Sequence, residues 1–99
     1  SPFILNELSR DTTIAVQDGA KVIEEMRVTP VGDIQARDWD AWAGSNGARN
    51  LPPAPAIPYI SLAYSGTDPL EFTVTVTWER RGRTRNIRLT SRATEAVLL

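Results

Sequence analysis

The chain has 99 residues, of which 41% are hydrophobic and 23% charged, and its formal net charge is −1. This length and composition indicate one globular domain, and the small net charge gives no overall attraction for nucleic acid or acidic lipid. The chain has no cysteine and no histidine, which excludes a thiol nucleophile, a thiolate zinc site and the commonest general base near neutral pH. No apolar run approaches the roughly 20 residues that cross a bilayer. Because the chain starts Ser-Pro-Phe-Ile-Leu without Met, we expect a fragment of a longer protein.

Residues 3–28 are predicted to form a helix, because apolar and small residues recur at spacings of three and four, with Val16 and Ile23 widening the stripe. The stripe consists of Leu5, Leu8, Thr12, Ala15, Gly19, Val22 and Met26. Gly19 costs a helix interior up to about 1 kcal/mol relative to Ala, so we expect a close approach to the sheet there. Asp11 is a possible second N-cap, at which the helix could start instead. Thr29-Pro30 ends the helix.

The opposite side of this helix is polar and is predicted to face solvent. Its candidate contact residues for another subunit are Gln17, Asp18, Lys21, Glu24 and Glu25. Glu24 and Glu25 are adjacent and therefore diverge across the helix surface. Asp38 and Asp40, two residues apart on a helix, also point to different sides, so neither pair forms a catalytic dyad. No glycine-rich phosphate loop and no EF-hand spacing is present. We therefore expect no catalytic residue, no metal and no cofactor, and a protein that is not an enzyme.

Residues 34–43 are predicted to form a second, short helix with Asp33 as its N-cap. Trp39 and Trp42 lie three residues apart on one side of it. We prefer the interpretation that they form a lid over the edge of the core to the alternative that they form a platform on which a ligand stacks. Residues 44–58 follow as a loop that contains Gly-Ser-Asn-Gly and Leu-Pro-Pro-Ala-Pro. This composition predicts a stiff connector from the helices to a sheet.

Residues 59–92 are predicted to form a three-stranded antiparallel meander, with strands at 59–65, 70–79 and 84–92. A two-residue turn at Arg81-Gly82 pairs Val76 with Ile87 and Val74 with Leu89. A turn at Gly66–Pro69 sets three more pairs, which are Tyr64 with Phe72, Leu62 with Val74 and Ile60 with Val76. A slip of one residue in either pairing would turn apolar side chains toward water, so the register is well specified.

The two faces of this sheet differ in polarity. The apolar face is predicted to carry Ile60, Leu62, Tyr64, Phe72, Val74, Val76, Trp78, Ile87 and Leu89. The polar face is predicted to carry Ser61, Ala63, Glu71, Thr73, Thr75, Thr77, Arg85, Arg88 and Thr90. One helix stripe laid on one apolar sheet face gives a single two-layer α+β domain over residues 1–99. Residues 93–99 form a tail that either adds to a sheet edge or leaves the domain.

Charge is distributed unevenly along the chain. Residues 1–79 hold five Lys and Arg against eleven Asp and Glu, whereas residues 80–99 hold six Arg against Glu95 alone. The candidate basic patch is Arg80, Arg81, Arg83, Arg85 and Arg88, with Arg92 beyond it. These residues could bind an anion or a DNA backbone, protect a sheet edge from aggregation, form salt bridges with Glu71 and Glu79, or contact the acidic helix of another subunit.

The order of these motifs resembles one family. An amphipathic helix ending Ala-Lys-Val-Ile-Glu-Glu-Met-Arg-Val-Thr-Pro is followed by a short Trp-bearing helix, a Leu-Pro loop and a meander containing Val-Thr-Val-Thr-Trp. The chain is similar over residues 11–92 to the globular part of a type IV minor pilin of the PilV type, or of a type II secretion minor pseudopilin of the GspI type. The match is carried by residues 20–27 and by Val74–Trp78 with the Arg-rich turn after it. The chain departs from many pilins because it lacks the cysteine pair of a C-terminal loop, which argues against a major pilin.

The resemblance implies a structural subunit that joins other minor pilins or pseudopilins to initiate or cap a filament. It also implies a processed leader and a hydrophobic half-helix before Ser1, which would anchor the subunit in the bacterial inner membrane. The globular domain would then lie in the periplasm or on a cell-surface pilus. A surface module for DNA uptake or adhesion, using the arginine hairpin, is the alternative. Nucleic acid is therefore a less favoured partner than other subunits.

Overall fold

The computed structural model describes the backbone of residues 2–66 and 70–93, and the side chains of residues 7–66 and 70–93. The sequence-based predictions for the side chain of Leu5, for residues 67–69 of the first sheet turn and for residues 94–99 of the tail lie outside these described residues. In chain order the elements are α1 (Pro2–Arg27), α2 (Val31–Ile34), α3 (Trp39–Ser45), β1 (Ile60–Ser65), β2 (Leu70–Arg80) and β3 (Arg83–Ala93).

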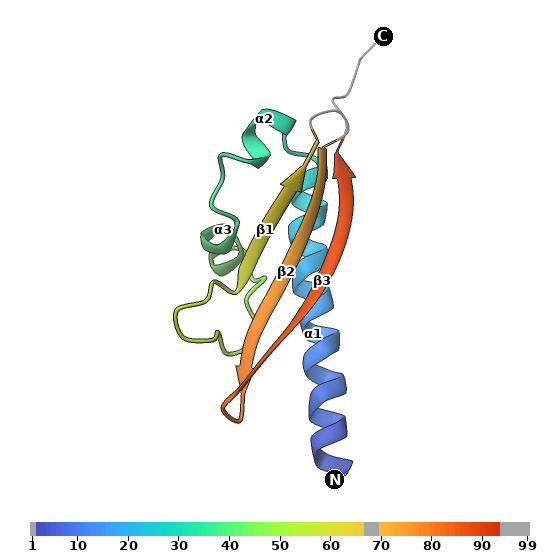
Figure 1. Ribbon diagram of the computed structural model, residues 1–99, viewed down its shortest axis with the longest axis vertical. Helices are drawn as coiled ribbons and strands as arrows, with labels where there is room; N and C mark the ends of the chain where they lie inside the picture. The colour runs from blue at the N-terminus through green and yellow to red at the C-terminus, as the bar shows by residue number, and fades with distance from the viewer. Residues whose placement is uncertain (1, 67–69, 94–99) are drawn as a thin grey trace.

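A long helix packed on a small antiparallel sheet makes the two layers of the domain. The strands lie in the order β1-β2-β3, and α1 crosses one face of the sheet (Figure 1). The predicted α+β class and the predicted layout of one helix on one meander are therefore confirmed. Among the described residues, no helix is both long enough and apolar enough to span a membrane.

Helix α1 is continuous over 26 residues, which corresponds to a length of about 39 Å. The alternative start at Asp11 is therefore wrong, and Asp11 instead lies inside the helix with an exposed fraction of 1%. The helix ends where the proline predicts. The Thr29 hydroxyl donates to the carbonyl of Glu25 at 2.7 Å, and Pro30 follows outside the helix.

The predicted stripe of α1 is buried in its described C-terminal part, where Ala15, Val22, Ile23 and Met26 belong to the core. Val16 and Ile23 were predicted to widen this stripe; Ile23 is buried in the core, whereas Val16, two helical turns earlier on the same side, is 40% exposed. A Cβ atom on Gly19 would lie 2.6 Å from Leu89 Cδ1. The predicted close approach of helix and sheet at Gly19 is thus confirmed, and no other residue fits there without a shift.

The predicted single helix over residues 34–43 is wrong, since two short helices replace it. Asp33 lies inside α2, and Asp38 caps α3 by accepting a hydrogen bond from the Ala41 amide at 3.1 Å. The chain turns between them and brings the Trp39 indole N–H to the Ile34 carbonyl at 2.8 Å. Burial of this large side chain explains why a turn is favoured over a continuous helix.

The predicted sheet register is confirmed. Val76 pairs with Ile87 and Val74 with Leu89 across β2 and β3, and Tyr64 pairs with Phe72 across β1 and β2. The strands are shifted from the predicted bounds by one residue at several ends. Alternation of apolar and polar residues along each strand leaves only this pairing with the apolar side chains on one face.

The turn between β2 and β3 has two residues, as predicted, and Arg80 pairs with Arg83 at its base. Arg81 and Gly82 have φ values of 55° and 74°. Two consecutive positive φ values are typical of a type I′ turn, whose twist matches that of antiparallel strands. The sharp turn brings Arg80, Arg81 and Arg83 close together at one end of the sheet.

The face of the sheet toward α1 carries the predicted apolar residues. Its buried members are Ile60, Phe72, Val74, Val76 and Trp78, and its partly buried members are Leu62, Tyr64, Ile87 and Leu89. Thr77 was predicted on the polar face, yet it is only 6% exposed. The segment before β1 runs along this end of β2, since the Thr77 amide donates to the Tyr59 carbonyl at 2.9 Å and the Glu79 amide to the Pro52 carbonyl at 2.9 Å.

Candidate functional site

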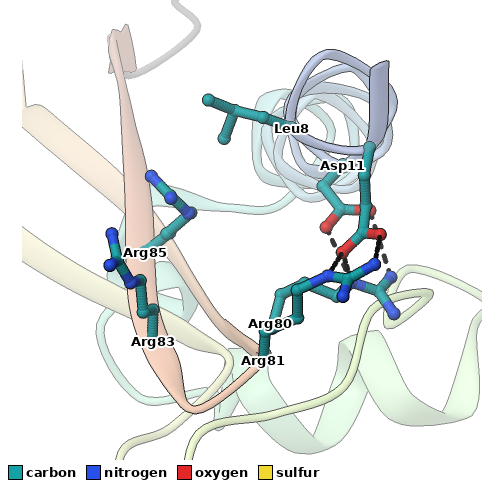
Figure 2. Close-up of a pocket in the computed structure, with 7 residues that line it drawn as sticks. Leu8, Asp11, Arg80, Arg81, Arg83 and Arg85 are labelled. Atoms are coloured by element: carbon teal, nitrogen blue, oxygen red, sulfur yellow. Dashed lines mark hydrogen bonds and ion pairs between the residues drawn. The ribbon is translucent and has the colours of Figure 1, made fainter. Parts of the chain in front are cut away.

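A hollow of about 260 Å³ lies between the N-terminal half of α1 and the β2–β3 turn, and we call it the hairpin cleft. Figure 2 shows that α1 forms one wall and the hairpin the other. Its lining residues are Glu7, Leu8, Asp11, Arg80, Arg81, Arg83 and Arg85. Four of the five residues of the predicted basic patch therefore lie in one place.

The strand pleat explains why arginines face the helix here. Successive residues of a strand point to opposite faces, so Arg80 lies on the same face as the buried Trp78. The register then pairs Arg80 with Arg83 and Trp78 with Arg85, which puts both β3 arginines on the face toward α1.

Asp11 and Arg80 form the most buried ion pair of the cleft. Arg80 Nε donates to Asp11 Oδ2 at 2.9 Å, and Arg80 Nη2 donates to Asp11 Oδ1 at 3.1 Å. The side chain of Asp11 is 2% exposed and that of Arg80 is 31% exposed. This bidentate geometry is the strongest arrangement of an arginine and a carboxylate, and it ties the middle of α1 to the end of β2.

Glu7 and Arg81 form a second bidentate pair one helical turn earlier. Arg81 Nε and Nη2 donate to the two Glu7 carboxylate oxygens at 3.2 and 3.0 Å. The hydrogen bond from Arg81 lowers the pKa of Glu7 below its ordinary value. The hydrogen bonds that Arg80 donates to Asp11 and Arg81 donates to Glu7 raise the pKa values of the two arginines. We call Glu7, Asp11, Arg80 and Arg81 the clamp, because they join elements about 70 residues apart in the sequence.

Arg83 and Arg85 lie on β3, apart from the ion pairs of the clamp (Figure 2). Among the residues that the structure describes, neither forms an ion pair. Arg85 was predicted to share the polar face with Arg88, and this is wrong because residues three apart on a strand face opposite sides. Arg88 lies on the outer face, opposite Thr75. Arg92 lies 3.3 Å from Glu71, so the predicted salt bridge to that residue is present.

The candidate contact residues on α1 do not all reach the surface. Gln17, Lys21 and Glu24 are exposed, and Glu25 is half-buried beside Arg37, 3.2 Å from its guanidinium. The prediction for Asp18 is wrong, because its exposed fraction is 3%. A second, shallower hollow lies along this side of α1 and is lined by Lys21, Glu24, Glu25, Trp42 and Asn46.

Asp18 holds the loop before β1 against α1. Its carboxylate accepts hydrogen bonds from the Tyr59 hydroxyl at 2.5 Å, the Asn50 side-chain amide at 2.6 Å and the Asn50 backbone amide at 3.0 Å. The pKa of Tyr59 is well above its ordinary value, mainly because the hydroxyl is buried and secondly because it donates a hydrogen bond to Asp18. Three donors satisfy a buried carboxylate, so this cluster has a structural role.

The two tryptophans of α3 meet edge to face, with their ring centroids 5.7 Å apart. Trp39 is 2% exposed, and the Arg37 guanidinium lies 4.9 Å above its ring. Trp42 is half-buried against the core. Their packing agrees with the predicted lid over the core edge, and Trp39 has no free face on which a ligand could stack.

Asp11 and Asp18 are the two buried acidic residues that the sequence-based reasoning assigned incorrectly. A signal for them exists, since Asp11, Ala15, Asp18 and Val22 are spaced by four, three and four residues, as one buried helix side requires. Two acidic residues in that register predict buried partners from elsewhere in the chain.

Among the described residues, no group of three or more Asp and Glu side chains is placed to hold a metal ion. Comparisons of the chain with protein-family models, with curated proteins and with solved structures gave no match.

Proposed function

We propose that this chain is the globular part of a structural filament subunit, a minor pilin or pseudopilin that joins other minor subunits to initiate or cap a type IV pilus or a type II secretion pseudopilus. One observation carries the proposal: α1 packs on the three-stranded meander through its C-terminal part, while its first turns extend past the β2–β3 turn (Figure 1). The order of the sequence motifs supports the same assignment.

A helix that extends beyond its own sheet can serve as a stem. In the proposed subunit the stem continues into an apolar half-helix before Ser1, which lies in the inner membrane before assembly and among the helices of neighbouring subunits afterwards. Such a stem holds the globular domain in a defined orientation only if the angle between the helix and the sheet is fixed. The clamp supplies this restraint, because two bidentate ion pairs fix the stem to the hairpin at Glu7 and Asp11.

The exposed side of α1 offers a contact surface for a neighbouring subunit. Gln17, Lys21 and Glu24 remain available on it, and the hollow beside Trp42 adds a partly apolar surface. Interfaces combine a buried apolar or aromatic centre with a polar rim, and this surface has both kinds of residue. In the proposed subunit the globular domain lies in the periplasm or on the pilus.

The coding region upstream of Ser1 provides the most direct test. We expect a junction of the type Gly-Phe-Thr-Leu-x-Glu followed by an apolar run of about 20 residues. A start codon immediately before Ser1, or an upstream region with no apolar run of that length, would contradict the proposal.

Photo-crosslinking in cells tests the contact surface with the full-length protein. A photoreactive residue replacing Lys21 or Glu24 should give crosslinks to other filament subunits. The same residue replacing Thr90, exposed on the outer face of the sheet, is the matched control and should give fewer. Equal crosslinking at Thr90 and at the two α1 positions would exclude α1 as the preferred contact.

A further inference from the structure

We propose that the hairpin cleft is a receptor for a single carboxylate side chain of a neighbouring subunit, bound by Arg83 and Arg85. The identity of the partner as a subunit rests on the proposed function, whereas the chemistry of the site rests on the geometry of the cleft alone.

The charges of the cleft do not balance. Four guanidinium groups face two carboxylates in the lining, which leaves an excess of two positive charges in a chain of net charge −1. Glu7 and Asp11 are each engaged in a bidentate pair with Arg81 or Arg80. Arg83 and Arg85 form no ion pair within the described part of the chain. An arginine can bind a carboxylate through two parallel hydrogen bonds, so the two β3 arginines are suited to an incoming one.

The partial burial of the Arg85 guanidinium costs free energy as long as no anion lies beside it. It lies directly opposite the buried Trp78, on the sheet face that packs apolar residues against α1 elsewhere. Its side chain is half-buried. A partly desolvated guanidinium is screened less by salt than one at an open surface, so an anion beside it is bound more strongly. The cleft therefore has both the charge and the partial enclosure that an anion site needs.

The residues that line the cleft favour a single carboxylate at the end of an aliphatic side chain over a polyanion. Leu8 forms an apolar part of the lining, against which the methylene groups of a glutamate can pack. Duplex DNA carries one charge about every 1.7 Å and needs a continuous basic track. The arginines provide no such track, because Arg88 lies on the opposite sheet face from Arg83 and Arg85.

An NMR titration of the 99-residue chain tests the proposal, with the arginine Nε–Hε groups as reporters. The probes are a capped Leu-Ala-Glu-Ala-Leu peptide, the same peptide with Gln for Glu, inorganic phosphate and a short DNA duplex. We expect the Glu peptide to shift the Arg83 and Arg85 signals in a saturable way, and the Gln peptide to leave them in place. A saturable shift with phosphate but none with the Glu peptide would overturn the assignment to a carboxylate.

Three variants locate the site. Arg85→Gln should weaken the Glu peptide about tenfold, as loss of a charge-assisted hydrogen-bond pair predicts. The double variant Arg83→Gln with Arg85→Gln should lose saturable binding, and Arg88→Gln, the matched control on the outer face, should change affinity less than about twofold. Unchanged amide spectra and melting temperatures establish that the variants fold, as expected for residues outside the clamp.

Three results would refute the receptor. They are the absence of saturable shifts at millimolar peptide, equal effects of the Arg85 and Arg88 substitutions, and DNA binding with a steep salt dependence that needs Arg88. Each of these leaves the filament proposal standing, because that proposal is decided by the sequence upstream of Ser1.

Discussion

Substitution of Arg80 by Ala should destabilise the domain more than substitution of its partner Asp11 by Ala. The reason is that the first change leaves a buried carboxylate without its partner, whereas the second leaves a guanidinium that is partly exposed. Arg80→Ala leaves a carboxylate that is 2% exposed, with no guanidinium facing it. Asp11→Ala leaves a guanidinium that is 31% exposed and lies 3.5 Å from Glu7, so water and a second carboxylate remain within its reach.

The expected magnitudes follow from burial. Breaking a fully buried ion pair costs about 3–5 kcal/mol, and the partial exposure of Arg80 reduces this to about 2–3 kcal/mol for Arg80→Ala. Asp11→Ala should cost about 1 kcal/mol, since Ala also has the higher helix propensity. The double variant should cost about 2 kcal/mol, which is less than the sum and corresponds to a coupling of about 1–2 kcal/mol.

Urea unfolding followed by circular dichroism measures these differences. In a domain of this size about 1 kcal/mol corresponds to 4–8 °C, so Arg80→Ala should lower Tm by about 10–20 °C. Arg83→Ala is the matched control and should change the free energy of unfolding by less than about 0.5 kcal/mol, because it is exposed and outside the clamp. Equal costs for Arg80→Ala and Asp11→Ala, or an additive double variant, would refute the reasoning.

Three further substitutions test the packing and the loop. Tyr59→Phe should cost about 1.5–2 kcal/mol because it removes a donor to the buried Asp18 carboxylate. The raised pKa of Tyr59 also means that its stabilisation is complete below the unfolded value of about 10 and is lost as the pH rises above it, so alkaline unfolding followed by circular dichroism should be less steep in Tyr59→Phe. Gly82→Ala should lower the free energy of unfolding in urea by about 1 kcal/mol, because the φ of Gly82 is 74°. An added Cβ would meet no neighbouring atom within 4 Å, so the cost comes from the backbone alone. Gly32→Ala is equally unhindered but lies in a helix, and it should be neutral or stabilising. Gly19→Val should lower the free energy of unfolding by about 2 kcal/mol through overpacking against the sheet, and a melting temperature equal to that of the unmodified chain would exclude the close contact.

The sheet could be predicted in detail because its information is local. Alternation along each strand and a two-residue turn at Arg81-Gly82 together allow one register, and a slip by one residue would expose Val74 and Val76. The same alternation, followed strictly through residue 85, puts Arg85 on the helix face. The position of Arg85 is therefore a local property of the strand, and the sequence alone is sufficient to place it.

The buried acidic residues could not be assigned in the same way. A helix pattern shows which side of α1 is apolar, but Asp11 and Asp18 are stable on that side only because Arg80, Tyr59 and Asn50 reach them from distant parts of the chain. The cost of burying a carboxylate depends on those donors, and no local pattern states where they lie. The split of residues 34–43 into two helices depends likewise on where Trp39 finds its acceptor.

Local periodicity and turn chemistry were enough to predict the long helix, the three strands, the sheet register, the single apolar face and the concentration of arginine at one hairpin. Which arginines of the hairpin form ion pairs depends on how α1 packs against it. Arg80 and Arg81 are engaged with α1, whereas Arg83 and Arg85 line a cleft that only the packing of helix on hairpin creates. The reason is physical: the ion pairs join residues about 70 positions apart, and their strength depends on burial that the folded layers provide.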